Sequence, residues 1–145
     1  AKDKGFSVVL WLDGVERRFI EEVGTSNIFF VLDGELITPP LQGSILPGIT
    51  RDSVLQLARN WGGKVSERPV SIEEIMTAAA NGRLQESFGT GTAAVISPIG
   101  ELTYQGRTVH INKGEAGPMS RRLYDELQAI QFGRQPDPFG WRVAI

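Results

Sequence analysis

The sequence predicts one domain of mixed α and β structure, with about three helices and at least eight short strands. Its 145 residues are enough for one domain with a hydrophobic core, and the fractions of hydrophobic (41%) and charged residues (22%) are typical of globular proteins. Short apolar runs separated by turn residues indicate the strands, and three stretches with apolar residues at helical spacing indicate the helices. No repeat or low-complexity linker divides the chain.

The strands expected in the first third of the chain are short and closely spaced. Ser7–Leu12 is an apolar run typical of a buried strand, and Phe19–Val23 is expected to form another extended piece. Asn27–Leu32 is rich in β-branched and aromatic residues. The Asp33-Gly34 dipeptide joins it to Glu35–Thr38 and is a strong signal for a β-hairpin.

A proline-rich loop and the first helix are expected next. Pro39–Gly48 contains three prolines and two glycines, which favour an extended loop. Thr50–Trp61 has apolar residues at helical spacing, and either Thr50 or Asp52 can cap its start. Gly62-Gly63 is expected to end this helix.

The remainder of the chain continues the alternation of strands and helices. Ser71-Ile72-Glu73-Glu74 has the spacing of a capping box, which predicts a helix from there to about Ala80. Gly89–Thr92 is expected to be a glycine-rich turn between two short strands. The expected strands are Lys64–Val70, Leu84–Phe88, Ala93–Ile96, a hairpin over Glu101–Ile111 with Gly106 in its turn, and a final Trp141–Ile145; Pro118–Ile130 is expected to be an amphipathic helix with Leu123, Leu127 and Ile130 on one side.

The composition excludes several classes of protein. The net charge is −2 and Lys and Arg are not clustered, so we expect no nucleic-acid binding. No apolar run approaches the roughly 20 residues that span a bilayer, and the start of the chain does not resemble a signal peptide, so we expect a cytoplasmic protein without membrane contact. The chain has no Cys, so a thiolate metal site is not expected. Because it has one His, we expect neither a His-rich metal site nor a Ser-His-Asp triad, and we expect no bound metal. His110 is interpreted as a surface or hairpin residue, and Trp11, Trp61 and Trp141 as residues of core or interface packing rather than of a ligand cage.

Three clusters of small polar residues lie next to expected strands or a helix start. Glu22–Asn27 contains a carboxylate beside apolar neighbours, which needs a partner if it is buried. Leu46–Arg51 enters a helix whose first N–H groups could bind a phosphate, with a hydroxyl from Thr50 and a charge from Arg51. Gly89–Ala94 allows a ligand to approach the backbone closely. Taken singly, each is more simply explained as a surface turn or an ordinary capped helix start.

The order and spacing of these clusters resemble the signature of the fold-type IV aminotransferases. The pattern is Glu22-x-Gly24-x-x-Asn27-Ile28-Phe29, then Leu36-x-Thr38, then Leu46-x-Gly48-Ile49-x-Arg51. The stretches EVGTSNIFFV, TPPLQGSILPGITR, SFGTGTAAVISP and IQFGRQPDPFGW are similar to the branched-chain amino-acid aminotransferases in particular, and this resemblance covers essentially the whole chain. It implies the C-terminal domain of that fold, with about three helices and a mostly antiparallel sheet.

The resemblance also implies a cofactor, pyridoxal 5'-phosphate (PLP), and the residues that hold it. Glu22 would pair with the pyridine nitrogen and keep it protonated, with Thr25 beside the cofactor. The phosphate would bind the backbone of Ile49 and Thr50 and the hydroxyl groups of Thr50 and Thr92. The backbone N–H groups of Ala93 and Ala94 would face the substrate carboxylate.

The activity implied is transfer of the amino group of leucine, isoleucine or valine to 2-oxoglutarate. In the family, the lysine that forms the Schiff base with PLP lies upstream of the strand that matches Ser7–Leu12. Lys2, Lys4, Lys64 and Lys113 match no such position, so we expect no catalytic residue within this numbering. We therefore expect residues 1–145 to be a single cofactor-binding domain without the N-terminal domain, inactive alone and part of a homodimer in the whole enzyme.

Two alternatives remain open from the sequence. The first is a D-amino-acid aminotransferase or an aminodeoxychorismate lyase, which share the fold. The second is a phosphate-binding module without catalysis, which would use Thr50 and Thr92 but would not need Glu22. A purely structural fragment is disfavoured, because interface cores are rich in aromatic and aliphatic anchors rather than in small polar residues.

Overall fold

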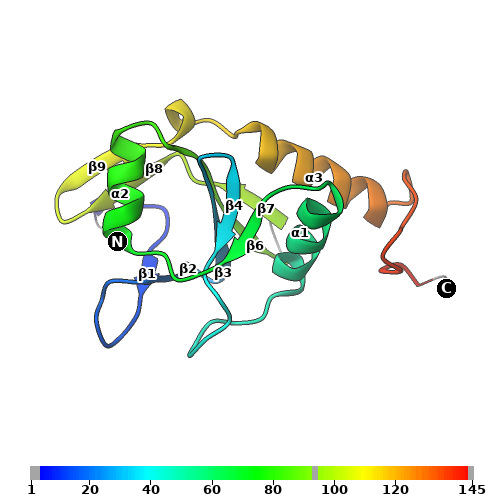
Figure 1. Ribbon diagram of the computed structural model, residues 1–145, viewed down its shortest axis with the longest axis horizontal. Helices are drawn as coiled ribbons and strands as arrows, with labels where there is room; N and C mark the ends of the chain where they lie inside the picture. Colours follow the sequence, from blue (N-terminus) through cyan, green and yellow to red (C-terminus); the bar gives the residue numbers. More distant parts are fainter. Residues whose placement is uncertain (1–3, 93–94, 144–145) are drawn as a thin grey trace.

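The computed structural model describes residues 4–92 and 95–143, and in these residues a seven-stranded sheet has helices on both of its faces (Figure 1). The strand order is β1-β2-β3-β4-β5, and β6 pairs with β3 and with β7. All pairs are antiparallel except β4 with β5, and a separate ribbon is formed by β8 and β9, so the expected mixed, mostly antiparallel fold is confirmed. The strands are β1 (Leu10–Leu12), β2 (Ile20–Val23), β3 (Ser26–Leu32), β4 (Glu35–Thr38), β5 (Val65–Glu67), β6 (Leu84–Gly91), β7 (Val95–Pro98), β8 (Glu101–Tyr104) and β9 (Arg107–His110); the helices are α1 (Ile49–Asn60), α2 (Ile72–Ala80) and α3 (Pro118–Gln131).

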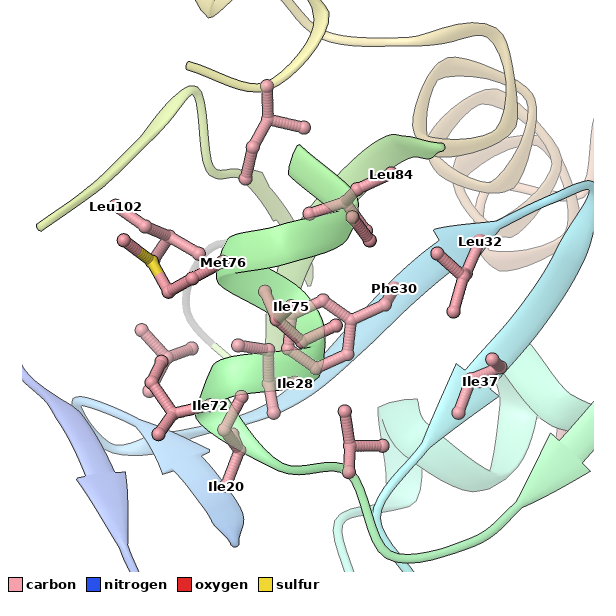
Figure 2. Close-up of a cluster of buried hydrophobic side chains, with 14 residues drawn as sticks. Ile20, Ile28, Phe30, Leu32, Ile37, Ile72, Ile75, Met76, Leu84 and Leu102 are labelled. Carbon is pink, nitrogen blue, oxygen red and sulfur yellow. The ribbon is translucent and has the colours of Figure 1, made fainter. Parts of the chain in front are cut away.

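Strand β3 is buried on both faces and divides the hydrophobic core into two clusters. Successive side chains of a strand point to opposite faces of the sheet. Ile28, Phe30 and Leu32 pack with α2, as Figure 2 shows, and Phe29 and Val31 pack with α1 and α3. Burying each of these side chains contributes about 1.5–3 kcal/mol. The near-continuous apolar sequence of β3 therefore reflects a strand covered by helices on both sides.

The turn between β3 and β4 has the geometry that its sequence predicts. Asp33 and Gly34 both have positive φ values, 50° and 78°, and Leu32 pairs with Glu35 across the turn. Glycine and aspartate accept this left-handed conformation more readily than most residues, which is why the dipeptide is a good hairpin signal. The predicted hairpin is confirmed.

The helix ends agree with the predictions at α2 but not at the start of α1. Ser71 caps α2, since its hydroxyl accepts the backbone N–H of Glu74 at 3.1 Å. Helix α1 instead begins at Ile49 after an extended Gly48, and no side chain of the described residues caps it. The expectation that Thr50 or Asp52 is the cap was wrong, because both lie inside the first turn rather than before it.

The glycine-rich segment after Phe88 is part of a strand. Strand β6 runs without interruption to Gly91, so the expected turn was wrong over Gly89–Gly91, and only Thr92 of the predicted residues lies in a turn. A Cβ at Gly89 would lie 3.0 Å from Val23 Cγ1, and one at Gly91 would lie 2.9 Å from Ser26 Oγ. Glycine is present because β2 and β3 approach here, and this close approach is a tertiary feature that turn statistics do not report. Ala93 and Ala94 lie outside the described residues.

A buried carboxylate on β6 anchors the start of α3. Glu86 is 4% exposed and accepts the backbone N–H groups of Met119 (2.8 Å) and Ser120 (2.9 Å) together with the Ser120 hydroxyl (2.6 Å). Gly117 lies directly above it, and a Cβ there would come within 2.1 Å of the Glu86 carboxyl carbon. Glu86 on β6 therefore caps α3: it accepts N–H groups that have no partner within the helix.

The predicted final strand, Trp141–Ile145, is not found in its described part, and Ala144 and Ile145 lie outside the described residues. Trp141–Val143 is not a strand, because Asp137 accepts the backbone N–H groups of Arg142 and Phe139 and folds the chain back on itself. Trp141 stacks on Phe139 with ring centroids 4.4 Å apart, and both pack against the core beside α1 and α3. No helix in the described part of the chain is long and apolar enough to cross a membrane.

The histidine and two of the tryptophans can be compared with their predicted roles. His110 is exposed on β9 with Nδ1 3.7 Å from Glu101, as expected of a hairpin residue. Trp61 is partly buried under the Arg122 guanidinium, which lies 3.7 Å from the centre of its ring. Trp11 is 52% exposed and donates its indole N–H to Gly24 O at 2.9 Å, so it is not a core residue.

Asp13 organises the loop between β1 and β2. Its carboxylate accepts the backbone N–H groups of Phe19 (2.8 Å), Arg18 (2.8 Å) and Glu16 (2.6 Å). These hydrogen bonds, the one from Phe19 most strongly, lower the pKa of Asp13 to about 2 because they favour the charged form.

Candidate functional site

Three polar side chains form a row across the sheet, one each from β2, β3 and β6. Asn27 pairs with Glu22 on one neighbouring strand and with Thr90 on the other. Residues directly opposite each other in adjacent strands project from the same face. Asn27 is two residues from Phe29, so this is the face that α1 covers. Asn27 and Thr90 are buried, and Glu22 is half-buried.

Leu46, in the loop before α1, is held by two members of this row. Its backbone N–H donates to Glu22 Oε1 at 2.9 Å, and its carbonyl accepts the side-chain amide of Asn27 at 2.8 Å. Gly48 lies so close that a Cβ there would be 2.3 Å from Asn27 Oδ1. Glu22 and the start of α1 are therefore joined through one residue of the loop and one amide side chain.

The start of α1 presents its first backbone N–H groups without a side-chain cap. The first intrahelical bond that begins at the cap runs from Asp52 N to Gly48 O, so the N–H groups of Ile49, Thr50 and Arg51 precede it. Unpaired N–H groups and the helix dipole make such a terminus favourable for an anion. Thr50 is partly exposed and adds a hydroxyl group at this end.

Arg51 does not contribute its charge to this helix start, contrary to the prediction. Its side chain is 4% exposed and donates to Pro39 O at 3.0 Å and to Glu67 Oε1 at 2.7 Å. The Arg51 guanidinium lowers the pKa of Glu67. Because a buried guanidinium needs several acceptors, Arg51 is turned toward β5 and ties α1 to the sheet.

The two threonines predicted to lie near the cofactor flank the same point of the sheet. Thr25 is exposed in the two-residue turn between β2 and β3, and Thr92 is exposed directly after β6. The start of β3 lies beside the end of β6, because Ser26 contacts the site where Gly91 would carry a Cβ. The structure thus brings Glu22, Thr25 and Thr92 to one end of the sheet, next to the start of α1. The predicted substrate contacts, Ala93 and Ala94, lie outside the described residues.

Asn27 and Thr90 are site residues to which the sequence reasoning gave no role. The Thr90 hydroxyl is buried without a hydrogen-bond partner among the described residues. Asn27 was part of the recognised pattern, but a polar residue at the start of an apolar strand gave no indication of its partner 19 residues away. An amide in a strand that is otherwise fully buried is the signal that could have marked it.

No hydrogen bond or ion pair joins a lysine of the described residues to this row. Lys64 forms an ion pair with Glu35 at 3.1 Å, and Lys4 and Lys113 are exposed. Lys2 lies outside the described residues. A cavity of about 300 Å³ lies between the loop containing Asp13 and the loop of Pro39–Ile45; Glu21 is in its lining, and no residue of the row is.

The arrangement can bind a ligand that carries an anion at one end and a protonated nitrogen at the other. Residues 1–102 match the family model of amino-transferase class IV. The chain belongs to the class IV aminotransferases. All 145 residues match branched-chain-amino-acid aminotransferase 2 of Bacillus subtilis (strain 168) at 55% identity, and they cover 40% of that protein.

Solved structures of class IV aminotransferases have the same fold. The branched-chain amino acid aminotransferase from Escherichia coli matches 97% of this chain with a TM-score of 0.81 and 33% identity, over 44% of its own chain. The branched-chain amino acid aminotransferase from Thermobaculum terrenum, solved in its PLP-form, matches 93% of this chain with a TM-score of 0.77 and 33% identity, over 40% of its own chain. The chain therefore spans well under half the length of the relatives that it matches.

Proposed function

We propose that residues 1–145 are the cofactor-binding C-terminal domain of a PLP-dependent branched-chain amino-acid aminotransferase. The N-terminal domain and the lysine that attaches the cofactor would lie elsewhere in the whole protein, and residues 1–145 alone would be inactive. Identity of 55% over the whole chain to a protein of that name, and the PLP-form of a structural relative, support this assignment. We propose that the whole protein forms a homodimer and is located in the cytoplasm.

The residues present fit the two ends of PLP. The uncapped start of α1 suits the phosphate, through the backbone of Ile49 and Thr50 and the Thr50 hydroxyl, with Thr92 as a second hydroxyl. Gly48 and Gly91 have no room for a Cβ, which indicates a backbone packed closely around this position. One oxygen of Glu22 is occupied by Leu46 N–H, and none of the described residues donates to the other, which is left for the pyridine nitrogen.

The surrounding residues complete the proposed site. Thr25 lies at the tip of the same hairpin as Glu22 and would border the cofactor. Ala93 and Ala94 follow Thr92 in the sequence and would offer backbone N–H groups to the substrate carboxylate. When bound, PLP supplies an electron sink for the pair released as the substrate loses its Cα proton. Glu22 would hold the proton on the pyridine nitrogen, because a carboxylate beside it favours the charged form.

The proposed reaction moves the amino group of leucine, isoleucine or valine to 2-oxoglutarate. With leucine, the products are 4-methyl-2-oxopentanoate and glutamate. The observation that supports the proposal is the connection of Glu22 to the start of α1 through Leu46, because a carboxylate joined in this way to an anion site would suit the two ends of one ligand.

The test is an assay of the whole protein with L-leucine, D-alanine and aminodeoxychorismate, each with the wild type and with Glu22→Gln. We expect glutamate from L-leucine and 2-oxoglutarate, and a loss of at least about 100-fold in kcat/KM for Glu22→Gln, about 3 kcal/mol of lost stabilisation. Glu21→Gln is the matched control, since Glu21 is the adjacent carboxylate. Among the described residues, its side chain accepts one hydrogen bond, from the Ser44 hydroxyl. Turnover of D-alanine or aminodeoxychorismate alone would assign a different enzyme of the family. Phosphate binding without turnover, unaffected by Glu22→Gln, would indicate a module without catalysis.

A further inference from the structure

We propose that Asn27 is a positioning residue that orients the Glu22 carboxylate toward the cofactor ring, acting through the backbone of Leu46. The inference rests on the proposed function and adds to it a residue that would not touch the cofactor ring itself. Asn27 is 5% exposed, and a buried amide at this position needs a partner of fixed geometry.

The contacts of Leu46 carry the inference. Leu46 is held at both of its backbone polar groups: its carbonyl accepts from Asn27 Nδ2 at 2.8 Å, and its N–H donates to Glu22 Oε1 at 2.9 Å. These two groups belong to successive peptide planes that meet at the Cα of Leu46. The side chain of Leu46 is 66% exposed, so packing of that side chain does not hold the residue in place. The Leu46 carbonyl also accepts the backbone N–H of Gly48 at 2.9 Å. Asn27 is the one side chain of the described residues that donates to Leu46, so its loss would leave the carbonyl held by Gly48 alone and would loosen the residue whose N–H binds Glu22.

The Asn27 side chain is packed closely against the start of α1. A Cβ at Gly48 would lie 2.3 Å from Asn27 Oδ1, so the Asn27 amide fills the space beside the start of α1. Asn27 and Glu22 also pair across β2 and β3, which holds their backbones in register. The Glu22 side chain itself has no described hydrogen bond other than that from Leu46 N–H, so its direction depends on where the loop sits.

The test uses the apo form of the whole protein and measures two dissociation constants. One is for PLP, and the other is for an analogue in which carbon replaces the pyridine nitrogen. The dissociation constant of the analogue divided by that of PLP reports the interaction at the nitrogen alone, because the phosphate contacts are the same for both ligands. Glu22→Gln should reduce this ratio by about tenfold, the value of a hydrogen bond to a charged group.

We expect Asn27→Ala to reduce the ratio by about threefold to tenfold, and to have no further effect when Glu22→Gln is already present, since coupled residues are not additive. Asn27→Leu, of similar volume, should behave like Asn27→Ala and serves if the smaller side chain prevents folding. Ser87→Ala is the matched control, because Ser87 also donates from a buried side chain to a carbonyl of β3, Phe29 O at 3.2 Å, and it should leave the ratio unchanged.

Two results would overturn the inference, and they are distinguishable. If the Asn27 variants weaken both ligands equally, as a general structural defect would, Asn27 does not act through Glu22 and the proposed function stands. If Glu22→Gln itself leaves the ratio unchanged, Glu22 does not face the pyridine nitrogen, and the proposed cofactor site fails together with the inference.

Discussion

Replacement of Glu86 by alanine is expected to destabilise the protein strongly, although Glu86 lies outside the proposed site. The change removes the acceptor of two backbone N–H groups and one hydroxyl at the start of α3. Gly117 precedes the helix and provides no side-chain cap, so no neighbouring group takes over this role. The perturbation therefore leaves buried donors of Met119 and Ser120 unpaired.

The expected loss follows from the number of donors left unpaired. An unsatisfied buried donor costs about 1–3 kcal/mol, so two N–H groups cost about 2–6 kcal/mol, with water entering the space lowering the result toward the smaller value. A typical domain is stable by only about 5–15 kcal/mol. In urea, with a slope of about 1–3 kcal/mol per M for small proteins, the unfolding midpoint should fall by at least about 0.7 M.

The assay is urea unfolding followed by circular dichroism, with two further variants. Glu86→Gln keeps the shape and one acceptor oxygen and should lie between wild type and Glu86→Ala. Glu115→Ala removes an exposed carboxylate close to the same helix start and should stay within about 0.5 kcal/mol of wild type. A midpoint for Glu86→Ala equal to that of Glu115→Ala would refute the reasoning, because it would mean that the N–H groups of α3 do not depend on Glu86.

Three further variants test other contacts. Gly48→Ala should lower stability by about 1–3 kcal/mol in urea unfolding, because its Cβ would overlap Asn27 Oδ1 at 2.3 Å. Asp13→Asn should lower stability near neutral pH, and the difference from wild type should shrink as the pH falls from about 4 through about 2; the pKa of Asp13 is about 2 in the folded protein, so its stabilisation exists above its ordinary pKa and disappears on protonation. Glu67→Ala should cost about 1–3 kcal/mol, as it leaves the buried Arg51 guanidinium with one partner fewer, reduced by the partial exposure of Glu67.

Matched controls separate these effects from general sensitivity to substitution. Gly14→Ala adds a methyl group where nothing lies within 4 Å, and its unfolding midpoint should match wild type. Glu73→Ala breaks an exposed ion pair with Arg107 and should cost at most about 1 kcal/mol. Equal losses in Gly48→Ala and Gly14→Ala would argue against the close packing at the start of α1, and a pH-independent effect of Asp13→Asn would argue against its lowered pKa.

The elements predicted correctly from sequence are those with local causes. The hairpin at Asp33-Gly34 and the capping by Ser71 depend on residues within a few positions, so the pattern contains the whole reason for them. The apolar run of β3 likewise predicted a strand. Its burial on both faces requires α1, α2 and α3, and only the structure displays that arrangement.

The predictions that failed concern residues whose partners are distant in the sequence. Gly89 and Gly91 suggested a turn, but Val23 and Ser26 approach them from neighbouring strands. Arg51 suggested an anion ligand, but Glu67, on β5, holds it in the interior. The residues proposed for the cofactor came from resemblance to a family. Leu46, which joins Glu22 to the start of α1, could be recognised only from its hydrogen bonds.

The pairing of β3 with β6 has a consequence for the order of folding. Glu22 and Asn27 share a hairpin closed by a two-residue turn, so they can meet within microseconds. Thr90 joins them only after α1, β5 and α2, which lie between the two strands in the chain, have been spanned. Such non-local pairing has a high contact order and slows folding toward milliseconds or seconds. In refolding, the capacity to bind a cofactor should therefore return with the slowest conformational phase, after most of the helical signal has been recovered.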